Sequence, residues 1–404
     1  MDATQAQRVL ESLRQGIPPD GFVRHFTVGR TAEISALEKK LSSNTGGALL
    51  LKANYGSGKT HLLRFIKETA LERGYAVSTI TLDAGAETRF NRMDQILGNV
   101  MRCIEVPGKM RRGPSALFEH ILDSMTSPCS DEKRKQRLNE LSSLGRWDHS
   151  ATLKSPSLYV ALRAWIIGSI NSDKLPHLPN EVEAWICEPW NYYTRTTWLY
   201  NQFVGDLRRY FHDPRADWQF YRRGTDTFIF KNSDYRQSWD ALADLQTLAN
   251  LGGLSGLVIL VDEFEDVIYG LRNIKYQQES FWNLFRLFDG EFPGLSFYAV
   301  TPSFIEKCKN LLIQKVSWDY DLSRFDRLTT FEMSPLETSE LEALAMKILE
   351  AHRIAYDWEP DLLMRTSHLN NIVRKTGSLP MQDRARYVIT SVVKALDELL
   401  QESE

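Results

Sequence analysis

Residues 53–60, ANYGSGKT, contain the residue types and the spacing that bind phosphate groups. Lys59 is a cation that would reach the outer phosphates of a nucleotide, and the Thr60 hydroxyl would coordinate Mg²⁺. Gly56 and Gly58 give the loop the backbone freedom that its N–H groups need to wrap phosphates. We therefore expect ATP to contact Gly56, Ser57, Gly58, Lys59, Thr60 and His61.

Ala53 occupies the position where the usual pattern G-x-x-x-x-G-K-[ST] has its first glycine. Alanine adopts every common conformation that needs no positive φ, so we expect the change to be tolerated. The flanking residues support the loop: the apolar run Ala48 to Leu51 predicts a buried strand, and Lys59 to Arg73 predicts a helix. A bare G-x-G-K-T also arises by chance, but not commonly between a strand and a helix.

A carboxylate pair follows a second apolar run, GLVILVDEFED. The run Leu257 to Asp262 predicts a parallel strand buried on both faces, with its acids at the carboxyl end where ligands bind in such sheets. Asp262 would hold the Mg²⁺ shell, and Glu263 would polarise the attacking water. Glu265 and Asp266 continue the acidic run, and we expect them to face solvent or a partner rather than the reaction.

Composition limits the class of protein. The chain has 404 residues, is 43% hydrophobic and carries a formal net charge of −3, so it can build a large core and has no overall basic character for nucleic acid. Neither its four cysteines nor its eight histidines have metal-ligand spacing. We see no signal peptide and no membrane-spanning apolar run, and we expect a cytoplasmic protein without membrane contact.

Strands alternate with helices along the rest of the chain, which predicts an α/β fold with a three-layer parallel sheet around the phosphate loop. Thr31 is expected to cap a helix whose apolar face includes Ile34, Leu37 and Leu41. A further helix is expected over Asn91 to Ile104. The other expected strands are Ala76 to Leu82, Leu295 to Val300, and one near Leu328 to Met333.

This pattern divides the chain into four parts. We predict an N-terminal helical segment (1–45), a P-loop core (46–104 and 246–333), a large and mainly helical insertion (105–245), and a C-terminal helical lid (334–404). The insertion is explained least. Its stretch 181–230 is rich in aromatic residues that would stack on single-stranded bases, but acidic residues there slightly outnumber basic ones, which favours a packed subdomain or a partner surface.

Several motifs resemble the AAA+ superfamily of ATPases. VGRTAEISALEKKL resembles the segment that the family places near adenine, and YAVTPS resembles its sensor 1 strand, which implies that Thr301 lies near the γ-phosphate. SRFDRL resembles a G-R-F-D-R stretch, which implies that Arg324 and Arg327 reach a neighbouring subunit's nucleotide. GSLPMQDRAR stands where sensor 2 would be, with Arg384 or Arg386 as candidates.

More narrowly, LRQGIPPDGFVRHFTVGR and the following GGALLLKANYGSGKTHLLRFIKETALERGY resemble the small ATP-binding protein of bacterial BREX-type phage-defence loci. This resemblance implies a homo-oligomer or a partner-dependent assembly that works with a helicase or a modification enzyme of the defence operon. It also implies that DNA is reached through the assembly or the insertion.

Two functions remain open from the sequence. The first is an ATP-hydrolysing motor or switch, and the second is a scaffold that ATP gates with little hydrolysis. Glu263 favours the first. A GTPase is disfavoured because no [NT]-K-x-D motif occurs, and LGGLSG at 251–256, which resembles an ABC-transporter signature, lies against the acid strand and is expected to be a loop.

Overall fold

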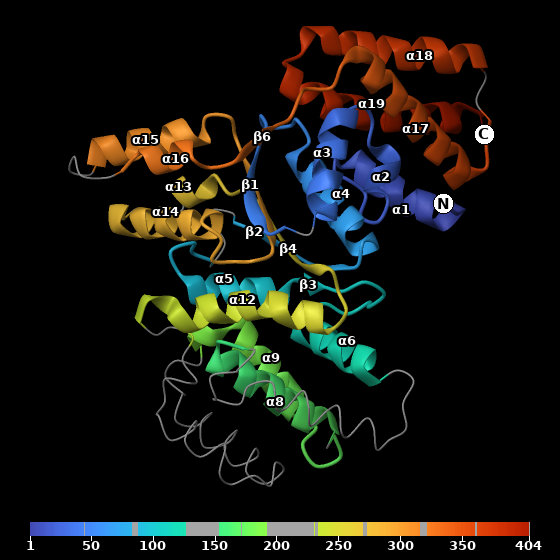
Figure 1. Ribbon diagram of the computed structural model, residues 1–404. Helices are drawn as coiled ribbons and strands as arrows, with labels where there is room; N and C mark the ends of the chain where they lie inside the picture. Colours follow the sequence, from blue (N-terminus) through green and yellow to red (C-terminus); the bar gives the residue numbers. More distant parts are fainter. Residues whose placement is uncertain are drawn as a thin grey trace, which may run out of the picture.

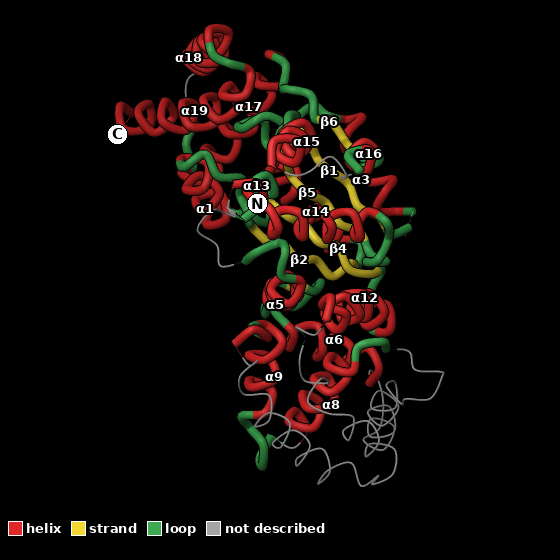
Figure 2. Tube along the Cα trace, turned by 90° about the vertical axis from the view of Figure 1, so that its left-hand side faces the viewer, coloured by secondary structure: helices red, strands yellow, loops and turns green. Residues whose placement is uncertain are grey.

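The computed structural model describes residues 1–43, 45–82, 88–126, 153–170, 172–191, 230, 233–269, 273–315, 321–359 and 362–403. A central sheet has helices on both sides (Figure 1). In Figure 2 the sheet lies between a helical group that includes the C-terminus and a second group that contains α8 and α9. Within these ranges, no helix combines the length and the apolar character needed to span a membrane.

The sheet has six strands in the order β3-β2-β4-β5-β1-β6. All neighbouring pairs are parallel except β2 and β3. β4 is buried along its whole length, which explains its nearly continuous apolar sequence, because a parallel strand between two helical layers has no solvent face. The strands are β1 (Gly47–Lys52), β2 (Tyr75–Thr81), β3 (Ile104–Glu105), β4 (Gly256–Asp262), β5 (Leu295–Val300) and β6 (Thr330–Glu332).

Helices bury both faces of this sheet. On one face, Leu51, Val77 and Leu260 pack in one core with apolar side chains of two helices from the N-terminal part of the chain. On the other face, alternate strand residues such as Leu50 and Ile259 pack in a larger core. The first face is covered by α3 (Thr31–Ser42) and α4 (Lys59–Glu72), and the second by α5 (Met93–Arg102), α12 (Arg236–Leu251), α14 (Ile274–Phe288) and α15 (Phe304–Lys315).

Two details of the expected elements are wrong. The helix expected to extend to Ile104 ends at Arg102, because Ile104 turns into β3 and pairs antiparallel with Ser78. This pairing satisfies backbone groups along the open edge of β2, so the sheet is mixed rather than wholly parallel. Thr31 does not cap α3; it is the first helical residue, and Arg30 precedes it in a left-handed conformation with φ 55°.

The described part of residues 105–245 is mainly helical. α8 is apolar on all sides and is buried among its neighbours, as its sequence PSLYVALRAWIIGSI requires. A charged sequence at residues 131–137, DEKRKQR, and most of the aromatic stretch from residue 192 onward lie outside the described residues. The helices here are α6 (Pro114–Thr126), α8 (Pro156–Ile170) and α9 (Leu178–Cys187).

The N-terminal helix α1 (Ala3–Arg14) shares its core with the C-terminal helices, far away in sequence. Its Arg14 donates two hydrogen bonds to the carboxylate of Asp397, at 2.9 and 2.8 Å, and the buried His352 contacts the same carboxylate at 3.1 Å. α1 is therefore fixed to the C-terminal group. That group consists of α17 (Thr338–Tyr356), α18 (Leu362–Lys375) and α19 (Met381–Ser403).

Candidate functional site

The loop between β1 and α4 turns through two left-handed residues. Gly56 has φ 74° and Gly58 has φ 91°, a region that side chains with a Cβ atom rarely enter, so both positions favour glycine. Ala53 has no positive φ, and its N–H donates to the carbonyl of Val300 at 3.0 Å. The backbone at this position therefore makes no demand that only glycine meets, as the sequence pattern predicts.

Lys59 is the first residue of α4, and its ammonium group is buried at the loop. The residue is 9% exposed. Its Nζ donates to the carbonyl oxygen of Ala53 at 3.2 Å, lies 4.5 Å from the ring centroid of Tyr55, and lies 3.7 Å from Oε1 of Glu265. Backbone, aromatic and carboxylate groups thus surround one cation beside the loop.

Thr60 and Asp262 join the phosphate loop to the carboxyl end of β4. The Thr60 hydroxyl donates to Oδ2 of Asp262 at 2.8 Å, and Oδ1 of Asp262 accepts the backbone N–H of Glu263 at 2.9 Å. A hydroxyl and a carboxylate side by side are oxygen donors of the kind that Mg²⁺ binds next to nucleotide phosphates. The chemistry of this pair therefore fits the expected ion.

The acids after β4 point in different directions. Glu263 has φ 54° and is exposed. Glu265 is only 2% exposed and faces Lys59, so the expectation that it contacts solvent or a partner is wrong. The reason is the left-handed turn at Glu263, after which Phe264 enters the core, where its ring centroid lies 5.0 Å from that of Tyr298. This anchor holds the next residue toward the interior.

These residues line a cavity of about 510 Å³. Its polar part is formed by the loop and the acids at the end of β4. Its apolar lining comes from the segment between α1 and α2 and from the C-terminal helices. The helix α2 spans Val23–Phe26. The polar part contains Gly56, Ser57, Gly58, Lys59, Thr60, His61, Asp262, Glu263 and Glu265, and the apolar part includes Ile17, Pro18, Pro19, Leu344 and Ile389.

Arg30 is a cavity residue to which the sequence motifs assign no role. Its Nη2 donates to the carbonyl of Ser57 at 2.6 Å, and burial lowers the pKa of Arg30 below its ordinary value. Its Nε is buried and has no hydrogen-bond partner in the described part of the chain. Arg30 makes its hydrogen bond to the loop from a left-handed backbone conformation. The only available sequence signal was its place in VGR, the segment expected near adenine.

His61 is held neutral at the start of α4. Burial lowers the pKa of His61 to about 4, and the positive charges of Arg30 and Arg64 lower it further in the same direction. Its Nε2 lies 2.9 Å from the Thr27 hydroxyl, which itself donates to the carbonyl of Val23 at 2.8 Å. Thr27 therefore accepts from His61, and the Nε2–H tautomer of the neutral ring follows.

The C-terminal helices contribute one arginine to the cavity. Arg386 lines it, whereas Arg384 does not and instead donates from Nε to the carbonyl of Leu379 at 3.2 Å. Thr301 also lies outside the lining. It directly follows β5 and is 5% exposed, and its hydroxyl has no hydrogen-bond partner in the ranges that the structure describes.

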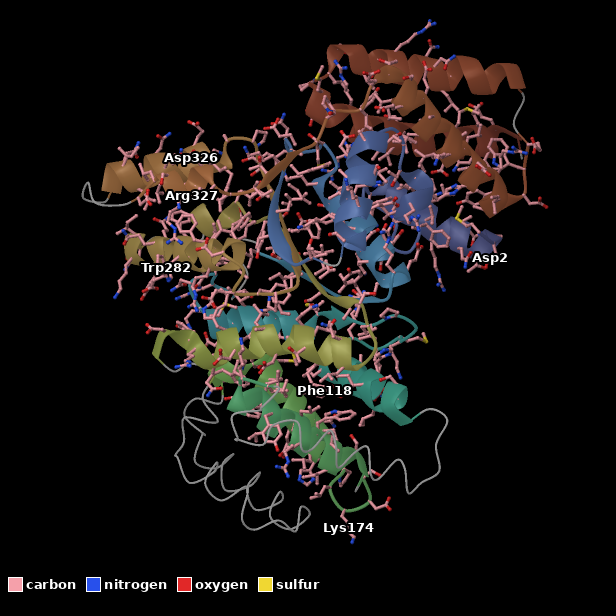
Figure 3. All side chains as sticks on the ribbon, viewed as in Figure 1. Asp2, Phe118, Lys174, Trp282, Asp326 and Arg327 are labelled. Carbon is pink, nitrogen blue, oxygen red and sulfur yellow. The ribbon has the colours of Figure 1, made fainter. Side chains whose placement is uncertain are left out.

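Arg324 and Arg327 lie away from the cavity, in and directly after α16 (Ser323–Asp326). Figure 3 labels Arg327 and Trp282 on the side of the molecule that holds α14, α15 and α16. Arg324 donates to Oδ2 of Asp289 at 2.7 Å and stacks on the ring of Trp282 at 4.8 Å. Arg327 is exposed and donates to the Ser323 hydroxyl at 3.3 Å. The cavity of a single chain therefore contains neither arginine.

Comparison with known proteins identifies the family. Residues 1–145 and 229–404 match the family model described as BREX system ATP-binding protein BrxC/D. The unmatched interval falls within the 105–245 segment. Searches of curated proteins and of solved structures gave no significant match. The match covers most of the chain and includes every residue of the cavity, and the chain therefore belongs to the BrxC/D family of BREX system ATP-binding proteins.

Proposed function

We propose that this protein binds and hydrolyses ATP as an AAA+-like motor or switch in a BREX phage-defence assembly. The observation that carries the proposal is the hydrogen bond of 2.8 Å between Thr60 and Asp262, beside Lys59 in one cavity. It brings together the phosphate loop and the acid strand, the two parts that phosphoryl transfer in P-loop enzymes requires.

The polar part of the cavity would bind the triphosphate. The loop and the N-terminus of α4 line it, so the positive end of the helix dipole would favour phosphate there, and Lys59 would reach the outer phosphates. Thr60 and Asp262 would hold Mg²⁺, directly or through water. When bound, the ion neutralises charge that develops on the phosphate oxygens.

The remaining groups would act on the γ-phosphate. Glu263 lines the cavity as an exposed carboxylate, which suits a base that positions and polarises water. Thr301 does not line the cavity, but it follows the strand between β4 and β1, and its hydroxyl, which has no hydrogen-bond partner among the described residues, supports the role of a polar sensor. Arg324 or Arg327 would enter the site of another subunit, because neither is at the cavity of its own chain.

The apolar part of the cavity would bind the base and link ATP to movement. Ile17, Pro18 and Pro19 line it together with Leu344 and Ile389, so one ligand would touch both the loop before α2 and the C-terminal lid. Arg386, from the same lid, is the better placed sensor 2 candidate. The cavity volume of about 510 Å³ lies within the usual range of small-molecule sites, roughly 300 to 1,000 Å³.

Family membership supports action within a defence assembly. We propose a cytoplasmic homo-oligomer, or an assembly that needs a partner for activity. The partner would be a helicase or modification enzyme of the same operon, and DNA would be contacted through that assembly or through residues 105–245.

A scaffold that ATP gates with little hydrolysis is the second candidate. It is favoured by the position of Arg324, which is engaged with Asp289 and Trp282 rather than with the cavity. If no second subunit or partner supplies an arginine, the site would bind ATP and turn it over slowly.

Measurement of ATP binding and steady-state hydrolysis separates these functions. Purified protein is assayed alone and with duplex or single-stranded DNA, beside Glu263→Gln and the exposed lid control Glu342→Gln. We expect Glu263→Gln to retain ATP binding and lose turnover by about 100-fold or more, as for a lost general base. Equal turnover in wild type and Glu263→Gln would support the scaffold instead.

A further inference from the structure

The ammonium group of Lys59 and the carboxylate of Glu265 form a buried ion pair inside the candidate ATP site. Nζ and Oε1 are 3.7 Å apart, which is beyond a good hydrogen bond, so the attraction between them is mainly electrostatic. Glu265 is 2% exposed, and its other oxygen, Oε2, is buried without a hydrogen-bond partner among the described residues. A carboxylate in this condition depends on Lys59 for compensation.

The backbone gives this carboxylate little freedom to leave. Phe264 is fully buried, and its N–H donates to the carbonyl of Ala299 at 3.2 Å. Its ring lies against Phe90, with centroids 4.8 Å apart. Because this anchor is adjacent in sequence, Glu265 stays at the cavity wall whether or not Lys59 remains beside it.

Phosphate groups compete with Glu265 for the same cation. If Lys59 turns toward the β- and γ-phosphates, the carboxylate loses its compensating charge and faces additional negative charge in a buried site. Both effects oppose binding of a triphosphate. Neither acts on a ligand that ends at its α-phosphate, beyond the reach of Lys59.

We propose that Glu265 is a competing counter-ion of Lys59 that weakens binding of nucleoside triphosphates and so lets bound nucleotide leave and exchange. Glu265 is a positioning residue, since it acts through Lys59. This inference rests on the ATP-binding part of the proposed function and adds to it an electrostatic control on affinity.

The test compares ATP and AMP binding by isothermal titration, with and without Mg²⁺, in wild type and Glu265→Gln. The amide keeps the shape and removes the charge. We expect the Kd for ATP to fall about tenfold, a change of about 1.4 kcal/mol, in both conditions, and the Kd for AMP to stay unchanged. A purely structural role would change the Kd for ATP and the Kd for AMP by the same factor.

Glu105→Gln is the matched control. Glu105, on β3, pairs at 3.0 Å with Lys67 of α4, the helix that begins with Lys59. Because Glu105 lies outside the cavity, removing its charge should leave the affinity for ATP unchanged. Thermal unfolding of each variant confirms that it folds. Glu265→Ala is a second way to remove the charge, and it should also bind ATP more tightly than wild type.

The outcomes are distinct. If wild type binds ATP and both Glu265 variants bind it equally or more weakly, the counter-ion role is wrong. If Glu265→Gln weakens ATP only in the presence of Mg²⁺, Glu265 instead supports the ion, and the proposal also fails. If neither wild type nor the Glu265 variants bind ATP, the proposed function itself is wrong.

Discussion

Nε2 of His61 lies 2.9 Å from the hydroxyl of Thr27, and this contact ties the first turn of α4 to the end of α2. Because Thr27 donates to Val23, it accepts from a neutral imidazole. His61 therefore connects the start of α4 with the segment before it that lines the apolar part of the cavity.

We expect acid to destabilise the protein through His61. Burial lowers its pKa from 6.5 to about 4, so between these values the unfolded chain binds more protons than the folded one, and stability falls as pH falls. Between pH 7.5 and pH 5 the contribution is about 2 kcal/mol. Denaturant unfolding across this range should show a shallower pH dependence for His61→Gln than for wild type.

The exposed His25 provides the control for this prediction. His25→Gln is the same substitution at an exposed position of α2. A His61→Gln protein whose stability falls with pH as steeply as wild type would show that His61 does not carry the effect.

Lys59→Ala should weaken ATP binding by about 10- to 100-fold or more. The change removes the cation beside the loop and, with it, charge-assisted hydrogen bonds to the outer phosphates. Lys39→Ala, which alters an exposed lysine on α3, should bind as wild type does. Equal affinity of Lys59→Ala and wild type in equilibrium titration would contradict the assignment of the loop.

Ala53→Gly should change ATP affinity by less than about threefold, below 1 kcal/mol. Ala53 needs no positive φ, and its N–H is already bonded within the sheet, to Val300. Restoring the usual glycine therefore adds no new contact to phosphate. A gain of tenfold or more in the same titration would mean that the present loop is compromised.

Hydrolysis should depend on association if Arg324 or Arg327 acts on another subunit. Alanine at the acting arginine should lower turnover by roughly 10³-fold, as for other arginines supplied in trans. Arg327 is the more exposed of the two. Mixing an arginine variant with Glu263→Gln, each inactive alone, should restore partial activity, because one interface then contains both intact halves.

Three measurements together would refute this role. They are turnover per subunit that does not change with protein concentration, a monomeric mass in the presence of ATP, and no recovery in the mixture. The pairing of Arg324 with Asp289 would then be an ordinary surface contact, since exposed ion pairs contribute little to stability.

The local elements of the candidate ATP site could be predicted because neighbouring residues carry their signals. An apolar run followed by a glycine loop and an amphipathic helix specified β1, the loop and α4, and the run ending at Asp262 specified β4. The family assignment was predicted from the same stretches and is confirmed. In both cases neighbouring residues carry the whole pattern.

Tertiary structure alone decided which distant side chains meet. The burial of Glu265 depends on the turn at Glu263 and on the place of Phe264 in the core, and the choice of Arg386 for the cavity depends on how α19 packs. The attachment of α1 to the C-terminal helices is equally long in range. Hydrophobic periodicity predicts that a helix buries one face, but the partner of that face is set by the packing of the whole chain.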